Sequence, residues 1–241
     1  ITSVNGEQLI SLMLDTEHNR AECWETELDQ DSTSYHSLTP LIPQCHWFER
    51  TVWDLFGLHP DGHPRLKHNL LHESYDPDFL PLSSVGTDHH FERHHQPPKS
   101  EFDIPGDENN RRDHRHFHPL EVHGEAIYEI PVGPIHAGII EPGHFRFSCL
   151  GEIIENLELH LGYVHRGVEK RLTEIPWRKG RFVVEAAASD SAAAYALAHS
   201  IAIESMFDLE APPRAHYLRY ISLEIERIAM HTADIGGIAG D

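Results

Sequence analysis

The fold of the second half of this chain is decided by residues 131–170, PVGPIHAGIIEPGHFRFSCLGEIIENLELHLGYVHRGVEK. Apolar and polar side chains alternate over residues 145–149, which predicts a half-buried β-strand. Gly151 and Glu152 predict a tight hairpin turn, and residues 153–161 predict the returning strand. Each polar residue near the turns would be ordinary by itself, but together they form a candidate site: His136, Glu141, His144, Arg166 and Glu169.

Helices are predicted after this stretch. Residues 183–206 are rich in alanine, the strongest helix former. Pro212 and Pro213 are typical of the first turn of another helix. An amphipathic helix then follows, ending at residues 234–237, with four aliphatic residues at helical spacing: Leu218, Ile221, Ile225 and Ile228.

The second informative region is residues 46–73. Phe48, Val52, Leu55 and Phe56 share one face of a predicted helix. Gly57 is typical of a helix C-terminus, and residues 59–64 predict a tight turn. Before this region, residues 24–28 predict a strand and residues 34–43 a polar connector. A capped helix followed by a polar turn predicts a packing element without a catalytic role.

Composition excludes several classes of protein. The formal net charge of −20 argues against nucleic-acid binding, which needs a basic surface. Three cysteines, far apart in the chain, favour a reducing compartment and form no CxxC pair. No run of 18 apolar residues predicts a membrane span. Because the chain begins at Ile1 without methionine and stops just after a glycine-rich turn, we expect a fragment of a longer protein.

Many of the 22 histidines lie between His59 and His123. This pattern has two interpretations, a metal-binding tract or a polar linker, and we favour the linker because spacing alone specifies no ligand geometry. Helical and strand periodicity also disappears over residues 76–120, where prolines and charged residues accumulate.

Residues 46–73 resemble the thirty-kilodalton subunit of complex I and its fused equivalent in formate-hydrogenlyase-type hydrogenases. The resemblance implies that this motif packs the subunit onto its neighbours and does no chemistry. The matching residues are Glu49, Arg50, Trp53, Asp54, Phe56, Gly57, Gly62, His63, Pro64 and Arg65.

A second resemblance covers GPIHAGIIEPGHFRF (133–147), LGYVHRGVEK (161–170) and PPRAHYLRYISLEIERIAMHTADIG (212–236). These segments are similar to the large subunit of group 4 membrane-bound [NiFe] hydrogenases and to the homologous forty-nine-kilodalton subunit of complex I. The implied fold class is α+β. A partial domain of the thirty-kilodalton type would occupy residues 1–75, an acidic linker 76–120, and a β-hairpin with helical bundle, the N-terminal part of the large-subunit fold, 121–241.

The resemblance also implies roles for individual residues. His136 matches the histidine that hydrogen-bonds the quinone headgroup in the complex I branch, and an imidazole suits proton delivery. Glu141 matches the glutamate that passes protons in hydrogenases. Arg166 and Glu169 match the RGxE motif that walls the cavity. His144 and His165 are expected to be structural.

This chain departs from both branches at residues 188–191. In the register set by Glu204, Ala188 and Ser191 occupy the positions of the first pair of nickel-binding cysteines, so no metal ligand is expected there. The quinone-binding tyrosine of the complex I branch falls at Ser189, which keeps a hydroxyl with a shorter reach. The second cysteine pair would lie beyond Asp241.

We therefore expect a nickel-free oxidoreductase subunit that is active only within a multisubunit complex. It would pass electrons between a small iron–sulfur subunit with a [4Fe–4S] cluster and quinone or a related acceptor, beside membrane-arm subunits. It would lie at the cytoplasmic, inner face of the cell membrane, with NADH, formate or ferredoxin as donor through other subunits. The alternatives are a non-catalytic scaffold that docks the iron–sulfur subunit to the membrane arm, and a functional group 4 [NiFe] hydrogenase.

Overall fold

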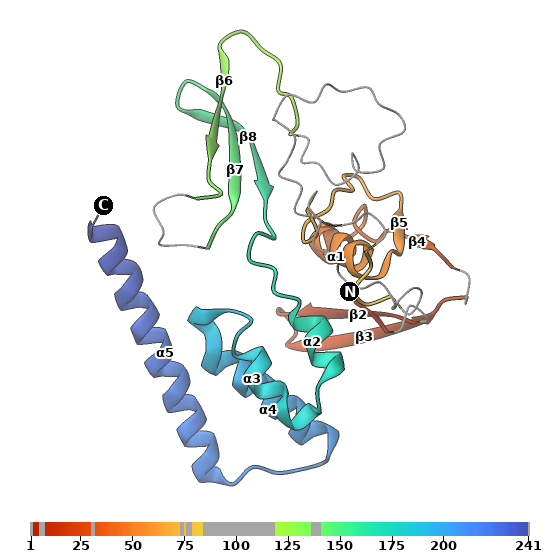
Figure 1. Ribbon diagram of the computed structural model, residues 1–241, viewed down its shortest axis with the longest axis vertical. Helices are drawn as coiled ribbons and strands as arrows, with labels where there is room; N and C mark the ends of the chain where they lie inside the picture. The colour runs from red at the N-terminus through yellow and green to blue at the C-terminus, as the bar shows by residue number, and fades with distance from the viewer. Residues whose placement is uncertain are drawn as a thin grey trace. The chain divides into compact units, whose positions relative to one another are not determined.

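The structure is a computed structural model that describes residues 2–4, 8–29, 32–72, 75, 79–83, 119–135 and 141–240. It contains both α-helices and β-strands, as predicted (Figure 1). The described chain divides into two compact units. One comprises Ile1–His136 with Pro142–Tyr163, and the other comprises Ala137–Glu141 with Val164–Asp241. Most of the predicted linker, including its histidine-rich residues 84–118, lies outside the described residues.

The first unit begins with an antiparallel sheet in the order β1-β2-β3, formed by β1 (Thr2–Val4), β2 (Gln8–Asp15) and β3 (Arg20–Glu27). The strand predicted from residues 24–28 is confirmed as part of β3. Leu9 of β2 is buried and joins Val52 and Leu58 in a small apolar core.

Helix α1 (His46–Phe56) ends where the sequence predicts. Gly57 adopts a left-handed conformation with φ of 77°, and its N–H donates to the carbonyl oxygen of Trp53 at 3.0 Å. Val52 and Leu55 are buried, but Phe48 is 56% exposed. The predicted helix is confirmed, and its apolar face is buried at Val52 and Leu55 and exposed at Phe48.

Residues 34–43 are more than the predicted connector. They contain β4 (Ser34–His36), which pairs in parallel with β5 (His59–Asp61). The turn predicted over residues 59–64 is shorter than expected, because its first three residues form β5. It centres on Gly62, which has φ of 80°. Each of these two short strands is stabilised by pairing with the other, although they lie far apart in the chain. Local sequence patterns do not predict such a pairing.

A second antiparallel sheet, in the order β6-β7-β8, completes the first unit (Figure 1). Strands β7 (His144–Leu150) and β8 (Ile153–His160) form the predicted hairpin around Gly151, and β6 (Ile127–Val132) adds a third strand. The register shifts between Ser148 and Cys149. Both residues are buried, so this bulge interrupts the predicted alternation.

The chain after α1 contacts the end of β8 within the first unit. Glu158 is only 2% exposed and forms ion pairs with Arg65 and with Lys67, the latter at 3.6 Å. Gly162 adopts φ of 93° and lies so close to the carbonyl oxygen of Asn69 that a Cβ atom would collide with it. A buried carboxylate and a glycine contact thus hold these two segments together.

The second unit is helical among the described residues. It contains α2 (Val168–Glu174), a 3₁₀ turn at Trp177–Lys179, α3 (Gly180–Val184), a 3₁₀ turn at Ser189–Ser191, α4 (Ala192–Met206) and α5 (Pro213–Gly240). The single helix predicted over residues 183–206 is wrong, because Ala188 is extended and separates α3 from α4.

Helix α5, blue in Figure 1, starts at Pro213 as predicted but continues through Gly240. The predicted end at residues 234–237 is wrong. Gly236 and Gly237 cost helix stability but do not adopt the positive φ that would end it. In the parts of the chain that the structure describes, even this 28-residue helix lacks the apolar character needed to cross a bilayer.

Candidate functional site

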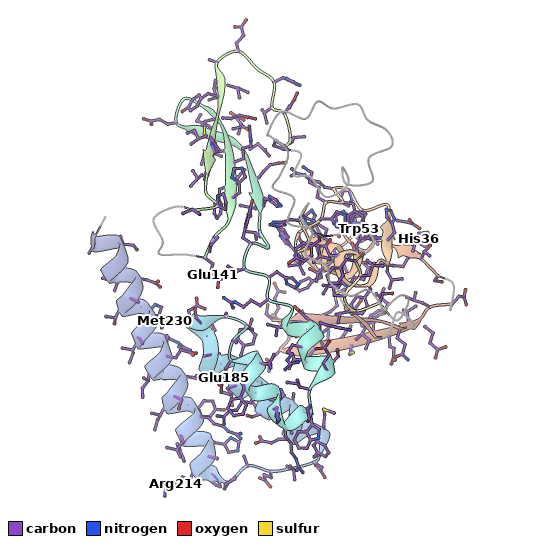
Figure 2. The ribbon with its side chains drawn as sticks, in the orientation of Figure 1. His36, Trp53, Glu141, Glu185, Arg214 and Met230 are labelled. Atoms are coloured by element: carbon purple, nitrogen blue, oxygen red, sulfur yellow. The ribbon has the colours of Figure 1, made fainter. Side chains whose placement is uncertain are left out.

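Arg166 connects three segments of the second unit. Its Nη1 donates to the carbonyl oxygens of Ala186 and Ala187 at 2.7 and 3.2 Å, and its Nη2 lies 3.4 Å from Oε1 of Glu141. Glu141 is labelled in Figure 2. Both side chains of this ion pair are about half exposed, so the pair by itself adds little stability. The pair matters for the arrangement of the site, because Arg166 links the carboxylate of Glu141 to the loop after α3.

The sequence around Arg166 explains this geometry. Gly167 adopts a left-handed conformation, with φ of 65°, immediately before α2. Ala186 and Ala187 follow the short helix α3, where carbonyl oxygens lack partners from a further helical turn. A guanidinium group supplies several hydrogen-bond donors in a fixed plane and can bind both carbonyls at once.

The loop that follows leads into α4, whose first turn is capped from α5. Glu226 accepts hydrogen bonds from the backbone N–H groups of Ala193 at 2.5 Å and Ala194 at 3.2 Å. A carboxylate at a helix N-terminus satisfies free donors and interacts favourably with the helix dipole. Sequence reasoning missed this cap, because Glu226 lies far along the chain from the helix that it caps.

The other end of α4 is also tied to α5. Arg219 donates from Nη1 to Oε2 of Glu204 at 2.9 Å, and its Nη2 binds the second carboxylate oxygen. This bidentate contact with Arg219 lowers the pKa of Glu204. The two ends of α4 are therefore both positioned by charged residues of α5.

A cavity of about 310 Å³ lies among α2, α3 and α4. Most of its lining is aliphatic, including Val168, Leu172 and Val184. The polar exceptions are His165, Arg166, Glu169 and Tyr195. A hollow that combines aliphatic side chains with a few polar groups can hold a small molecule.

Only some of the site residues proposed from the sequence line this cavity. Glu141 and Arg166 form an ion pair, and Arg166 and Glu169 both line the cavity. Ser189 is exposed in its 3₁₀ turn and is not part of the lining. His136 lies outside the described residues. Sequence reasoning missed Tyr195, since one tyrosine in an alanine-rich helix gives no distinguishing signal.

Charged residues of α1 have a different role, in which they bind loop backbone. Glu49 is fully buried and accepts hydrogen bonds from the backbone and hydroxyl groups of residues 37–39. Arg50 donates to the carbonyl oxygens of Lys67 and His68. Asp54 accepts from the N–H groups of residues 69 and 70 at 2.9 and 2.8 Å. These side chains pack loops onto the helix, in agreement with the predicted packing element.

A family model matches the region that contains α1. Residues 3–86 match the family model described as respiratory-chain NADH dehydrogenase, 30 Kd subunit. This region is a domain of that complex I type. The resemblance expected for residues 46–73 is thereby confirmed.

A further similarity covers nearly the whole chain. Hydrogenase-4 component G of Escherichia coli is 30% identical over 239 residues, which are 97% of this chain and 40% of that protein. Formate hydrogenlyase subunit 5 of the same organism is 29% identical over 237 residues, covering 97% and 39%. The fused C/D protein of NADH-quinone oxidoreductase from Nitrosospira multiformis is 25% identical over 236 residues, covering 95% and 38%. The chain thus spans about 40% of the length of these oxidoreductase subunits.

The residues present after α3 do not fit a nickel–iron centre. Ala188 has no ligand atom and Ser191 carries only a hydroxyl, so neither residue supplies the thiolate that a nickel–iron centre prefers. Cys23, Cys45 and Cys149 all belong to the first unit. In the described part of the chain, no three or more histidine, cysteine, aspartate or glutamate side chains are grouped to hold a metal.

A buried histidine lies where the segment after α1 meets the end of β8. The His72 and His160 rings are 4.3 Å apart between centroids, and the Tyr163 hydroxyl lies 3.2 Å from Nδ1 of His160. Burial, and to a smaller extent the neighbouring His72 and His144, lower the pKa of His160 to about 3. His160 is therefore neutral at physiological pH.

Proposed function

We propose that this chain is a redox subunit of a membrane-associated, complex I-like or hydrogenase-related oxidoreductase. It would pass electrons between a small iron–sulfur subunit and quinone or a related acceptor. The observation that supports this most strongly is the similarity of 95–97% of the chain to oxidoreductase subunits of both kinds. The absence of thiols at residues 188 and 191 favours an acceptor other than a nickel–iron centre.

In this proposal the acceptor lies beside the Arg166–Glu141 pair, in the cavity that Arg166 and Glu169 line. His136 would orient the acceptor or donate a proton, and Ser189 would offer a further hydroxyl. Glu141 would relay protons. A [4Fe–4S] cluster on the partner would supply two electrons, one at a time, so that the quinone takes up two electrons and two protons to become a hydroquinone.

The proposed setting follows the relatives. The domain organisation would comprise a part of the thirty-kilodalton type at residues 1–75, a linker at 76–120 and a large-subunit-like part at 121–241. The partners would be a small iron–sulfur subunit and membrane-arm subunits, with the chain peripheral to the inner face of the cell membrane. NADH, formate or ferredoxin would deliver electrons through other subunits.

Metal analysis and activity of the purified complex test this function. We expect no stoichiometric nickel, and quinone reduction that falls at least tenfold in His136→Ala and Glu141→Gln while assembly is preserved, an order of magnitude typical for loss of a proton-transfer group. Stoichiometric nickel with hydrogen-dependent viologen reduction would instead support the hydrogenase alternative. Unchanged electron flow in both variants would support the scaffold alternative.

A further inference from the structure

We infer that the outward side of the helical run at residues 177–184 is a docking surface for an acidic protein partner. This surface, here called the arginine–aromatic stripe, consists of Trp177, Arg178, Arg181 and Phe182. Its partner would present aspartate or glutamate side chains around an apolar centre. The inference rests on the proposed function only in requiring a multisubunit complex, and it does not depend on the acceptor that the complex reduces.

Helical spacing places the four residues of the stripe on one side of the run. The 3₁₀ turn at Trp177–Lys179 continues directly into α3 at Gly180. Residues at positions i, i+1, i+4 and i+5 are neighbours on a helix surface. The other side faces α4, because Gly180 is buried and a Cβ atom on it would collide with His199. The stripe therefore points away from α4, and all four of its side chains are exposed.

Positive charge is concentrated around the stripe in a chain that is otherwise strongly acidic. Residues 166–182 contain six of the 19 lysine and arginine residues but only two of the 39 acidic residues. Arg181 is paired with Glu185, labelled in Figure 2, at 3.1 Å. Among the described residues, no carboxylate forms an ion pair with Arg178 or Lys179. These two cations can therefore bind carboxylates of another molecule.

Exposed aromatic rings beside these charges favour a protein partner over a small anion. Trp177 and Phe182 are 47% and 65% exposed. The Trp177 ring lies 5.0 Å from that of Phe207, measured between centroids, which extends the apolar surface to the end of α4. The guanidinium groups of Arg178 and Arg181 lie over the rings of Trp177 and Phe182, each 5.1 Å from the centroid. Tryptophan and arginine are enriched at the centres of protein interfaces.

Charge also favours a protein over a membrane as the occupant. Aromatic and basic residues occur together in segments that bind anionic lipids. Here, however, the exposed Asp208 and Glu210 follow Phe207 closely in the chain, and the formal net charge is −20. An anionic lipid surface repels both. A protein can instead place individual carboxylates opposite Arg178, whose planar guanidinium group binds them through two parallel hydrogen bonds.

Carbodiimide cross-linking of the purified, intact complex tests the inference. The reagent joins a lysine amine directly to a carboxylate that contacts it, and Lys179 provides the amine beside the stripe. We expect mass spectrometry to find Lys179 joined to an aspartate or glutamate of another subunit. The inference is wrong if Lys179 is joined only to carboxylates of its own polypeptide, or to none.

Charge reversal measures how much the stripe contributes to affinity. Arg178→Glu should raise the dissociation constant of the partner subunit at least tenfold, because like charges then face each other. Phe182→Ser should raise it several-fold by removing apolar contact. Arg20→Glu makes the same charge change at an exposed residue of the first unit and should leave the constant unchanged. Mass photometry of the diluted complex measures these constants, and circular dichroism identifies the folded variants. Equal constants for Arg178→Glu and Arg20→Glu would overturn the inference.

Two further measurements separate the inference from its alternatives. If the wild-type chain sediments with vesicles of phosphatidylcholine and phosphatidylglycerol and Arg178→Glu does not, the stripe binds lipid and the inference is wrong. A complex that reduces quinone while Lys179 stays unlinked retains the proposed function and refutes the inference. A complex in which Lys179 is linked to another subunit but no quinone is reduced retains the docking surface and refutes the proposed function.

Discussion

The carboxylate of Glu226 on α5 accepts a hydrogen bond of 2.5 Å from the backbone N–H of Ala193 at the start of α4. This contact joins two helices at the end of α4 that carries Tyr195. Arg214 and Met230, labelled in Figure 2, mark the course of α5 to either side of Glu226 along the sequence. The start of α4 is thus held by a charge on the neighbouring helix.

Replacing Glu226 by alanine should lower the free energy of unfolding by about 1 kcal/mol, because two N–H groups lose their acceptor. Urea denaturation followed by circular dichroism measures this change. Glu224→Ala is the matched control, since Glu224 lies on the same helix in an exposed ion pair with Arg227 and should change stability by less than about 0.5 kcal/mol. Equal effects of the two substitutions would show that Glu226 does not act as a cap.

Arg166→Ala should loosen the loop at residues 186–191 with little effect on global stability. The guanidinium group holds the carbonyls of Ala186 and Ala187, but the side chain is half exposed. We expect amide hydrogen exchange in this loop to accelerate about tenfold, while exchange in α5 is unchanged. Arg171→Ala, which removes an exposed pair within α2, should leave the loop unaffected and serves as the control.

Glu158→Ala should be among the most destabilising substitutions in the first unit. It removes a buried carboxylate together with its ion pairs to the partly exposed Arg65 and Lys67, which should cost about 1–3 kcal/mol. Glu155→Ala on the same strand is the control, because Glu155 is exposed. Comparable chemical denaturation midpoints for the two variants would contradict the structural role of Glu158.

Gly57→Ala should destabilise more than Gly62→Ala, although both glycines have φ near 80°. Each substitution strains the backbone by about 1 kcal/mol. At Gly57 the new Cβ would also lie 2.6 Å from Cδ1 of Leu80, whereas nothing lies within 4 Å at Gly62. A difference in thermal unfolding midpoint between the two variants measures the cost of that contact, and identical midpoints would exclude it.

His160 should make the folded state sensitive to acid. Because its pKa falls from 6.5 to about 3 on folding, the unfolded chain binds an additional proton between these pH values. Stability therefore decreases as the pH falls below 6.5, by about 1–2 kcal/mol from pH 8 to pH 5. His160→Gln should remove this part of the pH dependence in urea denaturation. Replacing the exposed His231 by glutamine should leave this pH dependence in place.

The elements that were predicted correctly are those specified by neighbouring residues. Gly57 ends α1 because its own backbone tolerates positive φ, and residues 145–160 form a hairpin because Gly151 provides the turn. The predictions that failed depend on distant residues. Strand β4, which the sequence did not predict, needs its partner β5. The continuous helix over 183–206 is interrupted by an extended Ala188, at a loop that Arg166 holds from outside.

The candidate site divides in the same way. The sequence alone determined the residue chemistry: it identified Glu141, Arg166 and Glu169 as charged members of a motif, and it excluded thiolate ligands at residues 188 and 191. Only the tertiary structure brought Arg166 to Glu141 and to the loop carbonyls, and only it placed Tyr195 on the cavity while leaving Ser189 outside. The reason is physical. A residue type fixes which interactions a side chain can make, whereas the packing of α2 to α5 decides which partners lie within reach.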